Sequence, residues 1–208
     1  MPERNIYLES LFDAPQRLTQ VFGVNPQIYS QFGMKGHNGI DYVAPNGTVV
    51  YPILKGAVEY KDDGTGYGKH IRIFTNTGDK TIETIWGHLQ SSNFKTNDDI
   101  DARVPLGLTG NTGFCLPKGK GWHLHFGVRE WIEGHCLNYN NGFKGWLDPA
   151  TYDWDQWKEF LATSKPTEPT DQQIRQWALE IGLLKEGEDY DVRQLRAFNR
   201  YSKINNLK

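Results

Sequence analysis

The sequence of 208 residues has few cysteines, no long apolar run and little net charge. The two cysteines are scattered and form no Cys-x-x-Cys motif. No apolar stretch is long enough to cross a membrane. The formal net charge of -2 gives no electrostatic case for binding nucleic acid. We therefore expect neither a nucleic acid nor a membrane among the partners of this chain.

The two cysteines, Cys115 and Cys136, lie on either side of the apolar stretch 122–128. A disulfide between them is one interpretation if the protein works in an oxidising compartment. A metal site that uses His135 together with Cys136 is another. Two cysteines that belong to no paired motif are usually plain thiols, and this is the interpretation that we favour.

The chain is rich in glycine and in aromatic residues, as a β protein with many loops would be. Its length allows one domain with a real core and a small appendage. Alternating apolar and polar residues between turn signals predict a series of strands. The expected strands are 17–23, 48–53, 56–60, 70–74, 81–88 and 122–128.

The stretch 122–128 carries His123 and His125 on a β-prone background. Successive side chains of a strand point to opposite faces, so these two imidazoles share a face. A same-face pair of this kind can begin a metal site, since neutral imidazole is a common zinc ligand. By itself, the pair is more often two solvent-facing histidines.

Matching partners occur elsewhere in the chain. His37 and Asp41 are four residues apart, and Gly39 and the residues after it favour a strand that runs into a turn. His88 ends another strand-like segment. Two imidazoles and one carboxylate are the usual protein ligands of a catalytic zinc, which has a fourth position open for water. Two of the four histidines are then left for chemistry.

The motifs and the residues around them resemble the lysostaphin-type (LytM-like) zinc endopeptidases, which cut peptides of bacterial peptidoglycan. The resemblance covers roughly residues 20–130 and is strong because several motifs agree in order and spacing. The matching motifs are His37-x-x-x-Asp41, Gly87-His88-Leu89 and His123-Leu124-His125-Phe126, with Gly39-Ile40-Asp41-Tyr42, Tyr67-Gly68 and Gly110-Asn111-Thr112-Gly113 around them.

This resemblance implies a mainly β fold, an antiparallel β-sheet metallopeptidase domain of the duplicated-hybrid-motif type. It implies one Zn²⁺ per chain, held by His37, Asp41 and His125, and catalytic roles for His88 and His123. It also implies that bacterial peptidoglycan is the partner and substrate. A non-catalytic wall-binding or virion structural protein on the same fold is the alternative. A D-alanyl-D-alanine carboxypeptidase is disfavoured, because such relatives space the first His and Asp more widely.

The surroundings of the site yield further expectations. Residues 1–18 are expected to be a polar, irregular arm laid over the domain. Residues 25–36 are expected to be a loop along the substrate groove that carries Tyr29. The loop from Phe114 to Trp122 is longer than in relatives and is expected to form one wall of the groove. The aromatic residues of 131–154 are expected to pack behind the sheet. His70 and His135 match no motif and are taken as packing or surface histidines.

The chain is expected to divide into a peptidase domain (1–163), a proline-bearing linker (164–169) and a small C-terminal helical hairpin (170–208). A short amphipathic helix is expected at 154–161. The N-terminus lacks the basic start and apolar segment of a secretory signal. For a protein that acts on the cell wall, this favours release by a phage or carriage in a virion over a trimmed secreted form.

Overall fold

An antiparallel sheet forms the centre of the described part of the chain, which comprises residues 6–101, 103–115 and 121–162 of a computed structural model. Within those residues the sheet has nine strands in the order β1-β2-β10-β6-β5-β4-β8, and β11 and β12 also pair with β10. The strands are β1 (Arg17–Gln20), β2 (Ile40–Val43), β4 (Gly56–Asp62), β5 (Lys69–Asn76), β6 (Thr81–Gly87), β8 (Asp99–Ile100), β10 (His123–Ile132), β11 (His135–Cys136) and β12 (Trp146–Leu147). The predicted mainly β, antiparallel fold is therefore confirmed.

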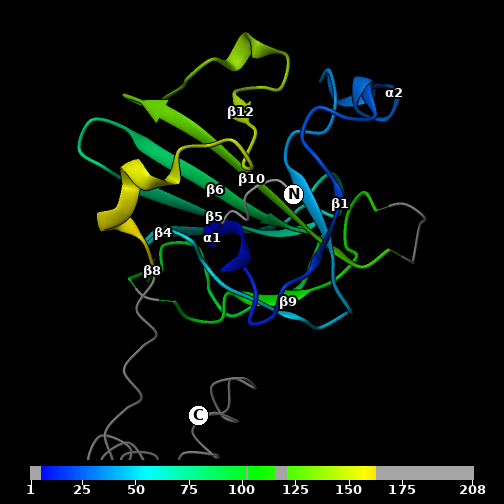
Figure 1. Cartoon of the computed structure of the whole chain (residues 1–208), viewed down its shortest axis with the longest axis horizontal. Helices are drawn as coiled ribbons and strands as arrows, with labels where there is room; N and C mark the ends of the chain where they lie inside the picture. Colours follow the sequence, from blue (N-terminus) through cyan, green and yellow to red (C-terminus); the bar gives the residue numbers. More distant parts are fainter. Residues whose placement is uncertain (1–5, 102, 116–120, 163–208) are drawn as a thin grey trace, which may run out of the picture. The chain divides into compact units, whose positions relative to one another are not determined.

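A second sheet of three strands completes the β architecture of the described residues. It consists of β3 (Val49–Val50), β9 (Gly107–Thr109) and β7 (Leu89–Ser92), in the order β3-β9-β7. The core draws side chains from both sheets, with Val50, Leu89 and Leu106 from the region of the small one. Figure 1 shows β9 below the long strands β10, β6 and β5, which carry the other half of the core.

Strand β10 crosses the centre of the large sheet, and its alternation positions the site. Leu124, Phe126 and Val128 are fully buried in the core. Since neighbouring residues of a strand face opposite ways, His123 and His125 point to the other face of the sheet. The same alternation on β5 and β6 turns Arg72 and Glu83 away from the core. The two histidines of β10 therefore share a face of the sheet with Arg72 and Glu83, opposite the core.

Short helices fill the connections. They are α1 (Ile6–Glu9), α2 (Pro26–Tyr29), η1 (Ser30–Phe32), η2 (Tyr139–Asn141) and η3 (Trp154–Phe160), of which the last three are 3₁₀ helices. The described part of the N-terminal arm packs onto the domain as expected. Its expected polar, irregular character is wrong, because it contains α1 and because Leu8, Leu11 and Phe12 are buried in the core. Residues 25–36 contain two short helices, and the helix expected at 154–161 is a 3₁₀ segment interrupted at Trp157. None of the described helices has the length and the apolar character needed to cross a membrane.

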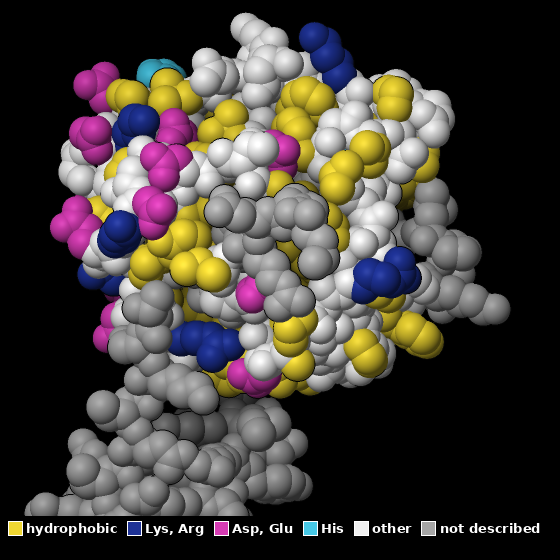
Figure 2. Space-filling model, in the orientation of Figure 1, with side chains coloured by type: hydrophobic (Ala, Val, Ile, Leu, Met, Phe, Trp, Pro, Cys, Tyr) yellow, Lys and Arg dark blue, Asp and Glu magenta, His cyan; other side chains and the backbone are white. Residues whose placement is uncertain are grey.

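Charged side chains of both signs share the surface. Figure 2 shows acidic groups gathered along one side of the visible face, with lysines, arginines and apolar side chains between them. The described residues belong to the unit formed by residues 1–164. The predicted linker (164–169) and helical hairpin (170–208) lie outside the described residues.

Candidate metal centre

Strand pairing brings Asp41 next to His125. Strand β10 lies between β2 and β6, and His125 is paired with Asp41 on one side and with Gly87 on the other. Directly paired residues of an antiparallel sheet point to the same face with neighbouring Cβ atoms. His123 is paired with Val43 and is therefore diagonal to Asp41. The register alone places both histidines of β10 beside the carboxylate.

His37 reaches the same place from outside the sheet. It precedes β2, which begins only at Ile40, so the expectation that His37 and Asp41 share one strand is wrong. The backbone N–H of His37 donates to Val24 O, and its carbonyl accepts from the N–H of Gly23, both at 2.8 Å. A Cβ on Gly36 would lie 2.2 Å from Gly23 O, so this close approach requires glycine. The bend rather than strand alternation aims the His37 ring at Asp41.

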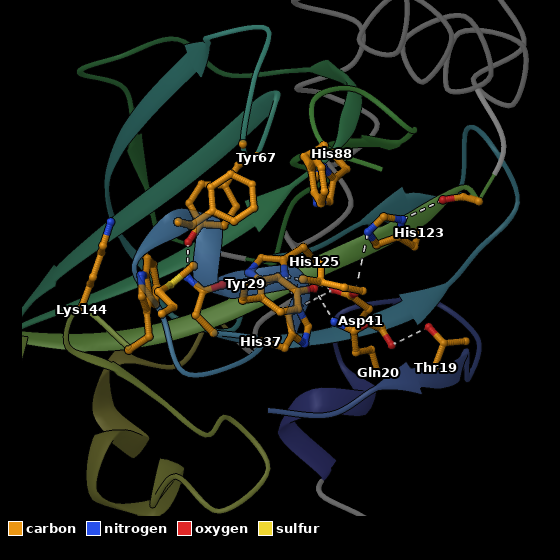
Figure 3. A pocket seen from close by; sticks show the side chains of 18 of the residues that line it. Thr19, Gln20, Tyr29, His37, Asp41, Tyr67, His88, His123, His125 and Lys144 are labelled. Carbon is orange, nitrogen blue, oxygen red and sulfur yellow. Dashed lines mark hydrogen bonds and ion pairs between the residues drawn. The ribbon is translucent and has the colours of Figure 1, made fainter. Parts of the chain in front are cut away.

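Three ligand atoms converge at this point (Figure 3). Asp41 Oδ1 lies 3.1 Å from His37 Nε2 and 3.0 Å from His125 Nδ1, and the two ring nitrogens are 2.9 Å apart. A proton can join only two of three such atoms, whereas a cation between them satisfies all three. Tetrahedral zinc with bonds near 2.1 Å would place its ligands about 3.4 Å apart, slightly wider than this triangle. The donor set therefore fits a zinc ion.

The outer sides of the rings are held by the fold. His37 Nδ1 donates to the carbonyl of Val21 at 3.2 Å, which leaves Nε2 with its lone pair facing Asp41. All three residues are buried. Burial lowers the pKa of His125 to about 4 despite the adjacent carboxylate. Burial alone would raise the pKa of Asp41, but its contacts with the His125 and His37 rings outweigh this and hold that pKa well below its usual range.

His88 and His123 form a second pair beside this group. Their ring centroids are 4.5 Å apart, and the His88 ring lies 6.0 Å from that of His125. Nδ1 of His88 donates to Thr112 O at 2.8 Å, and Nδ1 of His123 donates to Gly121 O at 2.7 Å. In its neutral form a ring held in this way has its lone pair on Nε2, and Nε2 of His123 is 3.8 Å from Asp41 Oδ2.

His88 is held in an unusual backbone conformation. Its φ of 61° lies in the left-handed region, which non-glycine residues rarely adopt. Its N–H donates to Tyr67 O at 2.8 Å, which fixes the turn at the end of β6. Burial, together with the charges of His123 and His125, lowers the pKa of His88 to about 3. The ring is therefore neutral at physiological pH. A strained, buried and neutral histidine of this kind is typical of a functional site.

Sequence reasoning missed three residues that support the centre. A Cβ on Gly39 would lie 2.6 Å from Cε1 of His125, so only glycine leaves room for that ring. The Tyr67 ring packs 5.1 Å from His125, and its hydroxyl accepts a hydrogen bond from the Asn38 amide. Gly39 and Tyr67 stand in the motif stretches, but nothing in the sequence joins them to His125.

Tyr29, whose role the sequence leaves open, lies at the centre. Its ring is 5.1 Å from that of His37, and its hydroxyl accepts from the side-chain amide of Gln20. Burial and the Asp41 carboxylate raise the pKa of Tyr29, so it keeps its proton. A neutral hydroxyl of this kind can form hydrogen bonds with a bound carbonyl or amide.

The centre opens into a cavity of about 560 Å³. Phe114 and Trp122 line it, in agreement with the expected groove wall, although residues 116–120 of that loop lie outside the described residues. Arg72 and Arg129 also line the cavity. Both pair with the fully buried Glu83, whose carboxylate accepts from Arg129 at 2.7 and 3.1 Å.

The remaining candidates take structural positions. His70 is buried and donates from Nδ1 to Gly68 O, whereas His135 is exposed on β11. Both cysteines are free, Cys115 buried and Cys136 half-buried, so the disulfide alternative is wrong. Trp154 is buried in the core, as expected for packing behind the sheet. The expectation is wrong for Trp146, which is buried on the site face and lines the cavity, and for the exposed Tyr139.

Comparison with curated proteins identifies relatives among bacterial cell-wall enzymes. Mpg of Neisseria meningitidis serogroup B, a DD-carboxypeptidase/endopeptidase, is 30% identical over 130 residues, which are 56% of this chain and 28% of that protein. The peptidoglycan DD-endopeptidase ShyC of Vibrio cholerae is 32% identical over 93 residues, 45% of this chain and 20% of its own length. The matched segments thus span less than a third of these two relatives.

Solved structures include two similar catalytic domains. That of the prophage-encoded M23 protein EnpA from Enterococcus faecalis is 26% identical, with 62% of this chain and 92% of that chain covered and a TM-score of 0.47. That of lysostaphin from Staphylococcus simulans is 25% identical, with the same coverages and TM-score. The sequence profile of peptidase family M23 matches residues 35–139, which are half of the chain and include the metal centre. The chain therefore belongs to peptidase family M23.

Proposed function

We propose that the chain is a zinc-dependent endopeptidase that hydrolyses peptide bonds in the stem peptides or cross-bridges of bacterial peptidoglycan. The observation that carries the proposal is the buried group of His37, Asp41 and His125, with two more histidines beside it. Two imidazoles and one carboxylate are a common ligand set of catalytic zinc. Membership of a peptidase family supports the reaction, and the name of the Vibrio relative supports the substrate.

In this proposal His37 Nε2, Asp41 Oδ1 and His125 Nδ1 hold one zinc ion per chain. When bound, zinc supplies Lewis-acid activation of a water molecule and of the substrate carbonyl. The hydrogen bond from His37 to Val21 O and the packing of Tyr67 on His125 orient the two rings. Phe114 and Trp122 offer an apolar wall against which a peptide can lie.

The two outer histidines have different roles in the proposed reaction. His123 Nε2 faces the centre with a free lone pair, so we assign it the acceptance of the water proton and its delivery to the leaving amine. His88, neutral because burial lowers its pKa to about 3, accepts a hydrogen bond at Nε2 and orients the water. The neutral Tyr29 hydroxyl is placed to donate to the substrate carbonyl.

The test uses the purified full chain and isolated peptidoglycan from several bacteria. We expect about one zinc per chain, loss of muropeptide release after treatment with a chelator, and recovery when zinc is added. Mass spectrometry of the released fragments identifies the bond that is cut. Because the Neisseria relative is also named a carboxypeptidase, the assay should include a peptide that ends in D-alanyl-D-alanine as a test substrate.

His135→Ala, a change at an exposed histidine, serves as the control and should behave like the parent. Hydrolysis by protein that contains no metal would overturn the zinc mechanism. Wall binding without any hydrolysis would favour the non-catalytic alternative. Release by a phage or carriage in a virion stays a prediction.

A further inference from the structure

A second cluster of metal-ligating side chains adjoins the first. His88, Cys115 and His123 each offer one ligand atom, and these atoms all lie within 4.8 Å of one another. Cys115 has no part in the proposed hydrolysis. It follows the turn that contains Thr112 and Gly113, and its side chain is buried against the two outer histidines.

The backbone holds this cluster in place. The carbonyl of Thr112 accepts from His88 Nδ1 at 2.8 Å and from the Cys115 thiol at 3.3 Å, so one oxygen positions both side chains. The Thr112 hydroxyl donates to Leu89 O at 2.8 Å and accepts from the N–H of Lys69 at 2.9 Å. The turn is therefore anchored to two strands, and the three donors are pre-positioned rather than carried on loose loops.

Two imidazoles and a thiol make a suitable ligand set for a thiophilic divalent cation such as Zn²⁺, Co²⁺ or Cd²⁺. Burial raises the pKa of Cys115 to about 12, so the free thiol keeps its proton at neutral pH. A bound cation displaces that proton and coordinates the thiolate. This displacement makes the cluster a weaker site than the His37, Asp41 and His125 group, in which no thiol has to be deprotonated.

We propose that His88, Cys115 and His123 form a second site for a thiophilic divalent cation, and that excess zinc bound there inhibits hydrolysis. The proposal that a second cation binds depends only on the geometry of this cluster, whereas the proposal that it inhibits hydrolysis rests on the proposed function. An imidazole that coordinates an ion no longer accepts a proton at that nitrogen. Because His123 Nε2 is only 3.8 Å from Asp41 Oδ2, a second ion also crowds the space in front of the first.

Titration of the metal-free full chain with Co²⁺ tests the binding. A thiolate ligand of Co²⁺ produces a charge-transfer band in the near ultraviolet, whereas imidazole and carboxylate ligands do not. We expect the parent to bind two equivalents and to show this band only with the second. Cys115→Ser should bind one equivalent without the band. Ser keeps a hydroxyl that can donate to Thr112 O, so the turn should persist.

Cys136→Ser is the matched control, because Cys136 is the other free thiol and lies outside the cluster, where it donates to the carbonyls of Leu137 and Lys144. It should bind two equivalents and show the band. A parent that binds a single equivalent without the band would overturn the second site. A band that persists in Cys115→Ser would overturn it as well.

A zinc titration of wall hydrolysis tests the inhibition. We expect activity to rise with the first equivalent and to fall as zinc is added in excess. Cys115→Ser should keep the basal activity and need at least about tenfold more zinc for the same inhibition, since even indirect partners of a metal contribute that much to affinity. A second ion that binds without inhibiting would overturn this part. A parent that binds its first equivalent and never hydrolyses would instead refute the proposed function and leave the second site standing.

Discussion

His123 and His125 share one face of β10 but have different surroundings. His125 Nδ1 lies 3.0 Å from Asp41 Oδ1, inside the ligand triangle, whereas His123 donates from Nδ1 to a backbone carbonyl and borders the triangle. We predict that His125→Ala purifies with little zinc and is inactive, because two remaining ligands hold zinc poorly. His123→Ala should keep its zinc and lose about 10²–10⁴-fold in turnover, the usual contribution of a proton-transfer group.

Metal analysis and peptide hydrolysis on the same preparations check this prediction. His88→Ala should keep zinc with a milder loss of activity, and His135→Ala, at an exposed position, should change neither quantity. The assignment is reversed if His123→Ala loses zinc and His125→Ala retains it. If both variants retain zinc and activity, the pair on β10 is not part of an active site.

Glu83 is a fully buried charge that depends on its partners. Its carboxylate accepts from Arg129 at 2.7 and 3.1 Å and from Trp131 Nε1 at 2.7 Å, and it forms an ion pair with Arg72. We predict that Glu83→Gln lowers the free energy of unfolding by about 3–5 kcal/mol, since it leaves the largely buried Arg129 without the carboxylate that compensates its charge. Urea unfolding measures the change.

Glu59→Gln is the matched control. Glu59 also pairs with Arg72, at 3.3 Å, but its side chain is 27% exposed, so its loss should cost less than about 1 kcal/mol. Equal losses for the two variants would mean that the buried network adds nothing beyond an ordinary surface pair.

At the level of elements, the sequence predicts strands well and connections poorly. Alternation of apolar and polar residues locates β10 and the shared face of its two histidines, because a strand in a half-buried sheet repeats every two residues. The bend before β2 has no such period. The spacing of four residues predicts that His37 and Asp41 share a strand face, whereas a close approach between Gly36 and Gly23 sets the position of His37.

Strand β10 is also a sensitive point of the core. Phe126 is fully buried, with its ring 5.2 Å from Trp86 and 6.0 Å from Trp154. We predict that Phe126→Ala lowers the free energy of unfolding by about 3–5 kcal/mol through lost burial and a cavity. Ile132→Ala, at the exposed end of the same strand, should cost about 1 kcal/mol or less. Urea unfolding of both variants tests the prediction. Similar decreases in the free energy of unfolding would contradict the central position of β10 in the core.

For the whole molecule, the motifs predict which residues lie together at the site, but they do not predict the contacts that position these residues. The predicted ligand and catalytic residues do lie together, and their roles stay predictions. Three supports come from folding alone. Thr112 O positions His88, the absence of a Cβ on Gly39 makes room for His125, and Cys115 joins the outer histidines. Such contacts join segments that are distant in the sequence, so they leave no local pattern from which periodicity or spacing could predict them.

The described residues of the site and of the core all belong to the unit formed by residues 1–164. The residues of the metal centre and its cavity lie between Thr19 and Trp146, and the core cluster draws on residues from Leu8 to Trp157. We therefore predict that a chain truncated after residue 169 keeps its fold, its zinc and its kcat/KM on a short soluble peptide. Circular dichroism, metal analysis and a peptide assay check these three properties.

The same truncated chain, assayed on whole peptidoglycan, separates catalysis from wall binding. Equal loss on the peptide and on the wall, with the fold intact, would show that residues 170–208 complete the groove and would contradict the predicted independence of the domain. Loss on the wall alone would mean that those residues serve the insoluble substrate. Since hydrolysis of a short peptide is predicted to need only the centre and its cavity, we expect the peptide activity to survive whether or not hydrolysis of the wall is lost.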